Sequence, residues 1–119
     1  MFTADAARAA AFYREVFGAE IGPGQPSVIR IGGVTLHVFE REGISADWSP
    51  VRLHHLAFEA SDVPEFVAIR DVLLARGACS EEVVDFGEHV SLMATDPDGG
   101  MLEVLVANDG ALPFPVVSR

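Results

Sequence analysis

The chain has 119 residues, half of them hydrophobic, and its 18 acidic and 8 basic residues give a formal net charge of −10. This length predicts one domain, 1–119, and no apolar run approaches the roughly 20 residues that a membrane span needs. The negative charge disfavours nucleic acid as a partner. With no secretory signal pattern and Cys79 as the only cysteine, we expect a cytoplasmic protein without an internal disulfide.

The first predicted element is an amphipathic helix that begins after Asp5 and ends before Gly18. Asp5 is a residue type that favours the N-cap position, and glycine is typical of helix C-termini. Apolar residues recur between them at helical spacing: Ala9, Phe12, Tyr13, Val16 and Phe17. Two strands follow, 27–31 and 34–40, and the Gly32-Gly33 pair between them predicts a hairpin.

The second half of the chain predicts a strand at 53–60 and then a second helix. Asp62 is its expected cap, Pro64 and Glu65 fit the first turn, and Gly77 closes it. The stripe of Phe66, Ile69 and Leu73 marks the buried side of this helix. Three further strands are expected at 83–86, 90–94 and 101–106.

The segment 96–100, Asp-Pro-Asp-Gly-Gly, predicts a tight turn, because proline presets φ, aspartates bond local amides and glycine accepts positive φ. On the strand that follows, Met101, Glu103 and Leu105 share one face. The opposite face carries Leu102, Val104 and Val106. An acid on a face otherwise lined by apolar side chains needs a partner, so Glu103 is a candidate functional residue.

The two halves repeat the same order of a strand, a helix and three strands. Alignment of Gly32-Gly33 with Gly99-Gly100 pairs Leu36 with Glu103. The repeat predicts an α+β fold of tandem βαβββ modules, which form a cupped, barrel-like mixed sheet with helices outside. Module one covers about 1–48 and module two about 53–109, followed by a tail, 110–119.

Only four residues precede Asp5, so most of the first strand of module one is missing. Strand 34–40 is then expected to expose an unpaired edge, which a partner subunit or the tail would cover. Alternatively, translation starts upstream and the sequence is shortened.

Three motifs in the expected order resemble the vicinal oxygen chelate superfamily, also called the glyoxalase/bleomycin resistance/dioxygenase group. They are the helix 9–18, which ends in Phe-Tyr-Arg-Glu-Val-Phe-Gly, the strand segment 55–58, His-Leu-Ala-Phe, and the turn 96–99 with Glu103 beyond it. The resemblance implies paired βαβββ modules around an open cavity, usually in a homodimer. In metal-dependent members, the first and last strands of each module supply the ligands.

Transferred to this chain, the ligand positions fall on His55 and Glu103 in module two. The position on the last strand of module one falls on Leu36, which cannot bind a metal, and the remaining position would precede Met1. A histidine and a carboxylate suit a divalent ion such as Fe, Mn, Zn or Ni, but they form an incomplete set.

Two classes of function follow from the resemblance. In the bleomycin-resistance type, the protein sequesters a small molecule, here a cationic one that suits the negative surface. In the metal-dependent type, the protein is a lyase, epimerase, dioxygenase or thiol transferase. The predicted pocket lining is Leu36, Val38, His55, Ala57, Glu59, His89, Met93, Met101, Glu103 and Leu105.

Each candidate also has a purely structural interpretation. His55 could be a partly exposed strand-end residue, Glu103 a solvated acid and His89 a residue at a loop edge. His37 lies on the opposite face of its strand from Leu36, which favours a structural role. Trp48 could cover the pocket or anchor the linker.

Overall fold

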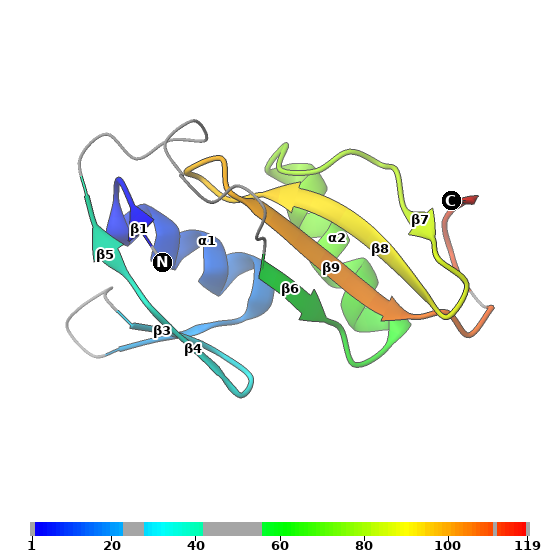
Figure 1. The fold of residues 1–119 in the computed structure, drawn as a ribbon, viewed down its shortest axis with the longest axis horizontal. Helices are drawn as coiled ribbons and strands as arrows, with labels where there is room; N and C mark the ends of the chain where they lie inside the picture. Colours follow the sequence, from blue (N-terminus) through cyan, green and yellow to red (C-terminus); the bar gives the residue numbers. More distant parts are fainter. Residues whose placement is uncertain (1, 23–27, 42–55, 111, 119) are drawn as a thin grey trace. The chain divides into compact units, whose positions relative to one another are not determined.

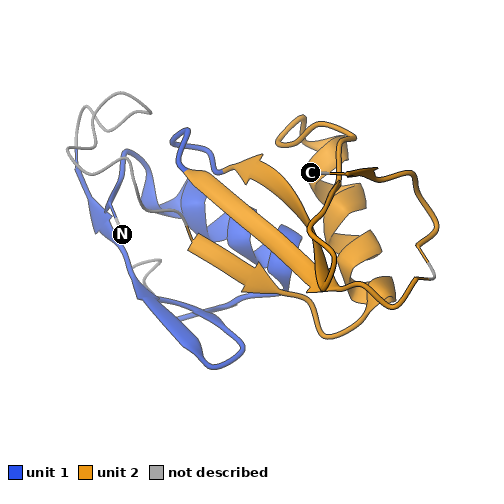
Figure 2. Ribbon diagram, turned by 45° about the vertical axis from the view of Figure 1, so that its right-hand side comes forward, with its two compact units in different colours: residues 1–52, 96–100 blue, residues 53–95, 101–119 orange. Residues whose placement is uncertain are grey.

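The computed structural model describes residues 2–22, 28–41, 56–110 and 112–118. The chain divides into two compact units (Figure 2). The first unit comprises Met1–Arg52 and Asp96–Gly100, and the second comprises Leu53–Thr95 and Met101–Arg119. No helix among the described residues is long and apolar enough to cross a membrane.

The helix of the first unit, α1 (Ala6–Phe17), confirms the prediction for this segment. The Asp5 side chain caps it by accepting a hydrogen bond from the Arg8 N–H at 3.0 Å. Gly18 ends it with φ +66°, a left-handed conformation that glycine adopts without strain, and its N–H bonds to the Arg14 carbonyl. The buried side of α1 consists of Ala9, Ala10, Phe12, Tyr13 and Val16.

The described residues of the first unit form five short strands (Figure 1): β1 (Phe2–Thr3), β2 (Glu20–Ile21), β3 (Val28–Ile31), β4 (Val34–His37) and β5 (Phe39–Glu40). Strands β2, β3 and β4 form an antiparallel sheet, and β1 pairs with β5 in parallel. The sequence did not predict β2, whose two residues are too few for a periodic pattern. The strand predicted at 34–40 is divided in two at Val38.

Strand β1 lies before α1 and occupies the position of the first strand of module one. Phe2 lies opposite Phe39 with ring centroids 5.8 Å apart, and Thr3 lies opposite Glu40. The expectation that the whole edge of 34–40 is open is therefore wrong at Phe39–Glu40. A two-residue strand is enough here because hydrogen bonds to the Asp98 side chain also hold Thr3 and Ala4.

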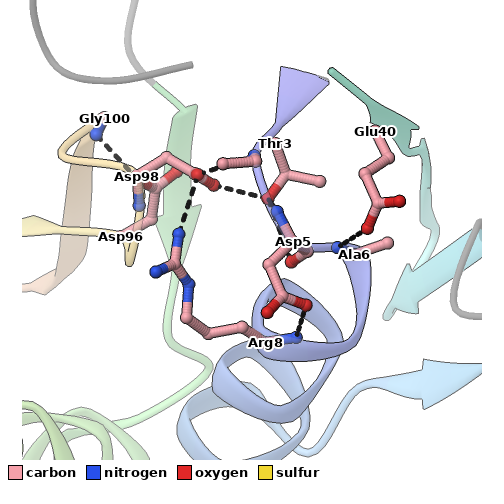
Figure 3. A network of polar contacts seen from close by, with 9 residues as sticks. Thr3, Asp5, Ala6, Arg8, Glu40, Asp96, Asp98 and Gly100 are labelled. Carbon is pink, nitrogen blue, oxygen red and sulfur yellow. Dashed lines mark hydrogen bonds and ion pairs between the residues drawn. The ribbon is translucent and has the colours of Figure 1, made fainter. Parts of the chain in front are cut away.

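Those hydrogen bonds come from the turn Asp96–Gly100, which belongs to the first unit. The buried Asp98 carboxylate accepts from the Thr3 hydroxyl at 2.7 Å and from the Ala4 N–H at 2.9 Å (Figure 3). The Arg8 guanidinium adds an ion pair at 3.1 Å. Asp98 thus anchors β1 and the start of α1.

Asp96 stabilises the turn itself, as predicted for its aspartates. Its Oδ1 accepts from the N–H groups of Asp98 at 2.9 Å and Gly100 at 2.8 Å (Figure 3). Gly99 has φ +81°, and a Cβ at Gly100 would lie only 2.9 Å from Asp96 Oδ2. Both glycines are therefore required by the geometry of the turn.

The helix of the second unit is α2 (Val63–Ala75), again as predicted. The Asp62 carboxylate accepts from the Glu65 N–H at 2.8 Å, and the Ser61 hydroxyl donates to Glu65 Oε2 at 2.6 Å. The expected stripe of Phe66, Ile69 and Leu73 is buried. Gly77 has φ +66°, which ends the helical conformation after the C-cap Arg76.

In the second unit, the described strands form one five-stranded sheet in the order β10-β7-β8-β9-β6. Its strands are β6 (Leu56–Glu59), β7 (Val84–Asp85), β8 (His89–Thr95), β9 (Met101–Ala107) and β10 (Val117–Ser118). Strands β7, β8 and β9 are antiparallel, and β6 is parallel to β9. In each unit, the strand before the helix thus pairs in parallel with the last strand of the repeat. This arrangement confirms the α+β fold, and the described strands form no closed barrel.

The C-terminal tail belongs to the second unit. Strand β10 pairs in parallel with β7, and Phe114 packs against Phe66 with ring centroids 5.6 Å apart. The Arg70 guanidinium lies 5.0 Å from the centroid of the Phe114 ring. The proposal that the tail covers the edge of strand 34–40 is therefore wrong for residues 112–118, because this apolar contact holds them on the second unit.

Candidate functional site

The site with the strongest chemical character is one face of the sheet in the second unit. The strand registers place Glu103 of β9 between Ala57 of β6 and Met93 of β8 (Figure 1). Paired residues in neighbouring strands point to the same face of a sheet. The three side chains therefore share one face, which we call the open face.

Burial separates the two faces of this sheet as the alternation predicted. The opposite face carries the buried Val90, Leu92, Ala94, Leu102, Val104 and Val106. On the open face, Met93 is 40% and Met101 is 53% exposed, while Glu103 and Leu105 are half-buried. Large apolar side chains that stay exposed around a carboxylate are typical of a ligand-binding surface.

A hydrogen bond from Ser91 fixes the Glu103 carboxylate. The Ser91 hydroxyl donates to Glu103 Oε2 at 2.7 Å. Ser91 lies opposite Leu105 and Glu103 opposite Met93, so the bonded residues are diagonal neighbours on adjacent strands. Ser91 is only 3% exposed although its side chain belongs to the open face. Alternation with Met93 places Ser91 on this face, but the bond cannot be predicted from the sequence, because a diagonal contact depends on strand register.

Two further predicted lining residues lie on the same sheet. Glu59 is exposed at the end of β6, opposite Leu105. His89 is half-buried at the start of β8, and its ring stacks on Phe86 with centroids 5.2 Å apart and an interplanar angle of 16°. This stacking supports the interpretation of His89 as a residue at the edge of a loop.

His55, His54 and Trp48 lie outside the described residues. The predicted pairing of His55 with Glu103 therefore stays a prediction. Among the residues that the structure describes, no group of three or more His, Cys, Asp or Glu side chains could hold a metal ion. Glu103 has the chemistry of a metal ligand, and His55 directly precedes β6 in the sequence.

In the first unit, strand register changes which residue corresponds to Glu103. In the first unit, Phe2 lies three positions before the N-cap Asp5 and pairs with Phe39. In the second unit, Glu59 lies three positions before the N-cap Asp62 and pairs with Leu105. Two positions earlier in the chain are His37, the last residue of β4, and Glu103 of β9. His37 therefore corresponds to Glu103, and the alignment with Leu36 is wrong by one residue.

The burial of the first unit agrees with this register. Leu36 lies opposite the fully buried Ile29, and Val38 is buried, whereas His37 is exposed on the other face. The alignment of Gly32-Gly33 with Gly99-Gly100 fails because the two connections differ in length. Residues 32–33 join β3 to β4, but residues 96–100 join β8 to β9. The predicted wall residues Leu36 and Val38 thus share a face with the core residue Ile29.

Burial also decides the chemistry of Cys79. It raises the pKa of the Cys79 thiol, and the nearby Arg70 opposes this only in part. A thiol with a raised pKa is a poor nucleophile at neutral pH.

Comparison with known proteins matches residues from both modules to one family. A family model described as the Glyoxalase/Bleomycin resistance protein/Dioxygenase superfamily matches residues 1–104. No curated protein matches the sequence.

Several solved structures are similar. Lactoylglutathione lyase from Agrobacterium tumefaciens is 26% identical, with a TM-score of 0.66, and the match covers 97% of this chain and 93% of that one. The oxidase ChaP-H1 is 25% identical, with a TM-score of 0.71 and coverages of 93% and 94%. The fosfomycin resistance protein FosX from Mesorhizobium loti is 21% identical, with a TM-score of 0.68 and coverages of 89% and 86%, which supports the fold alone.

Proposed function

The chain belongs to the Glyoxalase/Bleomycin resistance protein/Dioxygenase superfamily, the vicinal oxygen chelate group, and we propose that it binds a small cationic molecule on the open face of the second unit. Glu103 is the charged contact in this proposal, and Ala57, Met93, Met101 and Leu105 provide apolar surface. The observation that supports it most is the Glu103 carboxylate, fixed by the buried Ser91 on a face with exposed methionines.

Such a surface favours a guest that combines apolar area with positive charge. Apolar contact supplies affinity, and a fixed carboxylate supplies orientation and charge selectivity. The net charge of −10 also raises the local concentration of cations. The protein would then act by sequestration, as the name bleomycin resistance suggests. The homodimer and the cytoplasmic location expected from the sequence stay predictions.

The second candidate function is a metal-dependent enzyme of the lyase, epimerase, dioxygenase or thiol transferase type. Glu103 fits a divalent ion such as Fe, Mn, Zn or Ni, because ligating carboxylates are commonly oriented by a hydrogen bond of the kind Ser91 makes. His55 would be the second ligand. A bound ion would supply a Lewis acid that polarises a substrate oxygen. The likeness to a lactoylglutathione lyase and an oxidase favours this candidate.

Metal analysis of the purified protein distinguishes the two candidates. Sequestration predicts less than stoichiometric metal in the wild type and no change in His55→Ala. A stoichiometric divalent ion that is lost in His55→Ala would reject sequestration and support the enzyme.

Calorimetry with metal-free bleomycin, used as the cationic probe, tests the role of Glu103. We expect Glu103→Gln to weaken binding about tenfold or more, which is about 1.4 kcal/mol. Glu82→Gln is the matched control, because it makes the same charge change at an exposed loop residue outside the open face. Equal affinities of Glu103→Gln and the wild type would contradict the proposal.

A further inference from the structure

We propose that Ser91 is a positioning residue, whose buried hydroxyl holds the Glu103 carboxylate in one orientation on the open face. The proposal that this orientation serves guest binding rests on the function proposed above. The orientation itself depends only on the structure.

The position of Ser91 in the sheet makes its hydroxyl a fixed donor. Strand β8 has neighbours on both sides, and Ser91 lies opposite Val84 of β7 and Leu105 of β9. With 3% exposure, the Ser91 side chain is shielded from water, which would otherwise compete for the Glu103 oxygen. At 2.7 Å the bond has the length typical of a hydroxyl donor and a carboxylate acceptor.

The bond constrains a side chain that otherwise has many conformations. Glutamate loses considerable rotamer freedom when it is fixed, and an unrestrained Glu103 would lose that freedom each time a guest binds. With the hydrogen bond from Ser91, Glu103 loses this rotamer freedom during folding instead. A carboxylate has about four acceptor positions, so a hydrogen bond from Ser91 is compatible with a contact between Glu103 and a cation.

A purely structural role would satisfy a buried hydroxyl and nothing more. Both roles predict some loss of stability in Ser91→Ala, so the free energy of unfolding does not separate them. Two measurements distinguish the positioning role from the purely structural role: the order of the Glu103 side chain and the affinity for a cation. Substitution of a partner that orients a ligating residue typically reduces metal affinity about 10- to 100-fold.

The experiment compares Ser91→Ala, Ser91→Thr and Ser61→Ala with the wild type. Ser91→Thr keeps the hydroxyl. Ser61→Ala is the matched control, because it removes another serine–glutamate bond, from Ser61 Oγ to Glu65 Oε2 at 2.6 Å, at the exposed start of α2. The first measurement is ¹³C relaxation of the Glu103 side chain. The second is the affinity for a cation, measured with Mn²⁺ by electron paramagnetic resonance and with metal-free bleomycin by calorimetry.

We expect Glu103 to lose order in Ser91→Ala and to keep it in Ser91→Thr and Ser61→Ala. The affinity for the cation that the wild type binds, Mn²⁺ or bleomycin, should fall about tenfold in Ser91→Ala only. An equally ordered Glu103 in Ser91→Ala would overturn the positioning by Ser91, and lost order with an unchanged cation affinity would overturn its role in guest binding. If Glu103 loses order but the wild type binds neither Mn²⁺ nor bleomycin, the proposed function fails while the positioning of Glu103 by Ser91 stands.

Discussion

At the scale of single residues, the two aspartates of the turn 96–100 have different environments. Asp98 bonds to Thr3, Ala4 and Arg8, which are far from it in the sequence. Asp96 bonds to the backbone of its own turn. Burial raises the pKa of the Asp96 carboxyl, and the N–H donors of Gly100 and Asp98 oppose this only in part. Burial also raises the pKa of the Tyr13 hydroxyl, with smaller contributions from the two carboxylates.

The raised pKa of Asp96 predicts that Asp96→Asn stabilises the protein at neutral pH. Because the folded pKa exceeds the unfolded one, the stabilising contribution of this group is complete below the unfolded pKa and is lost as pH rises through the folded pKa. Asparagine resembles the neutral form and keeps an oxygen that can accept both backbone bonds.

Urea unfolding between pH 3 and pH 8 tests this prediction. The stability advantage of Asp96→Asn over the wild type should be largest near neutrality and should shrink toward zero at the acidic end. An advantage that grows as the pH falls would show that the pKa of Asp96 is lowered instead.

At the scale of elements, β4 shows how register assigns side chains to faces. Leu36 lies opposite the buried Ile29, and His37 lies opposite Val28 on the exposed face. A shift of one residue would exchange the two faces, because side chains alternate along a strand. The parallel pairing of β1 with β5 supports the same register.

This register predicts unequal effects of two neighbouring alanine substitutions. Leu36→Ala should lower the free energy of unfolding by about 1–2.5 kcal/mol, roughly half the cost for a fully buried leucine, because Leu36 is half-buried. His37→Ala should change it by less than about 0.5 kcal/mol, as is usual at exposed positions. Denaturant titrations followed by circular dichroism would measure both values, and a larger loss in His37→Ala would contradict the register.

At the scale of the whole molecule, charge repulsion is the dominant long-range electrostatic effect. The formal net charge is −10. An ion pair of 3.1 Å joins Arg8 to Asp98, and the Arg8 side chain is 48% exposed. Such a half-exposed pair contributes at most about 1 kcal/mol. Repulsion among many surface carboxylates therefore outweighs it.

We consequently expect salt to stabilise the protein. An increase from 10 mM to 300 mM NaCl shortens the Debye length from about 30 Å to about 6 Å, which screens the repulsion. The midpoint of thermal unfolding should rise by a few degrees, since about 1 kcal/mol corresponds to about 4–8 °C in a domain of 60–100 residues. A constant midpoint in tetramethylammonium chloride, together with a rise in MnCl₂, would indicate specific cation binding instead of screening.

The sequence by itself determined the two helices, their caps, the turn 96–100 and the repeated βαβββ order. These features depend on local patterns, such as Asp5 and Gly18 around a helical apolar stripe, so no tertiary information was needed. The face of β9 that carries Glu103 followed from simple alternation.

Only the tertiary structure decided the pairing of β1 with β5, the docking of Phe114 on Phe66 and the correspondence of His37 with Glu103. It also revealed the bonds from Ser91 to Glu103 and from Thr3 to Asp98. Each of these contacts joins residues from different elements, and its geometry depends on strand register and on loop length. Local propensity does not encode either quantity, because both are set by how the elements pack.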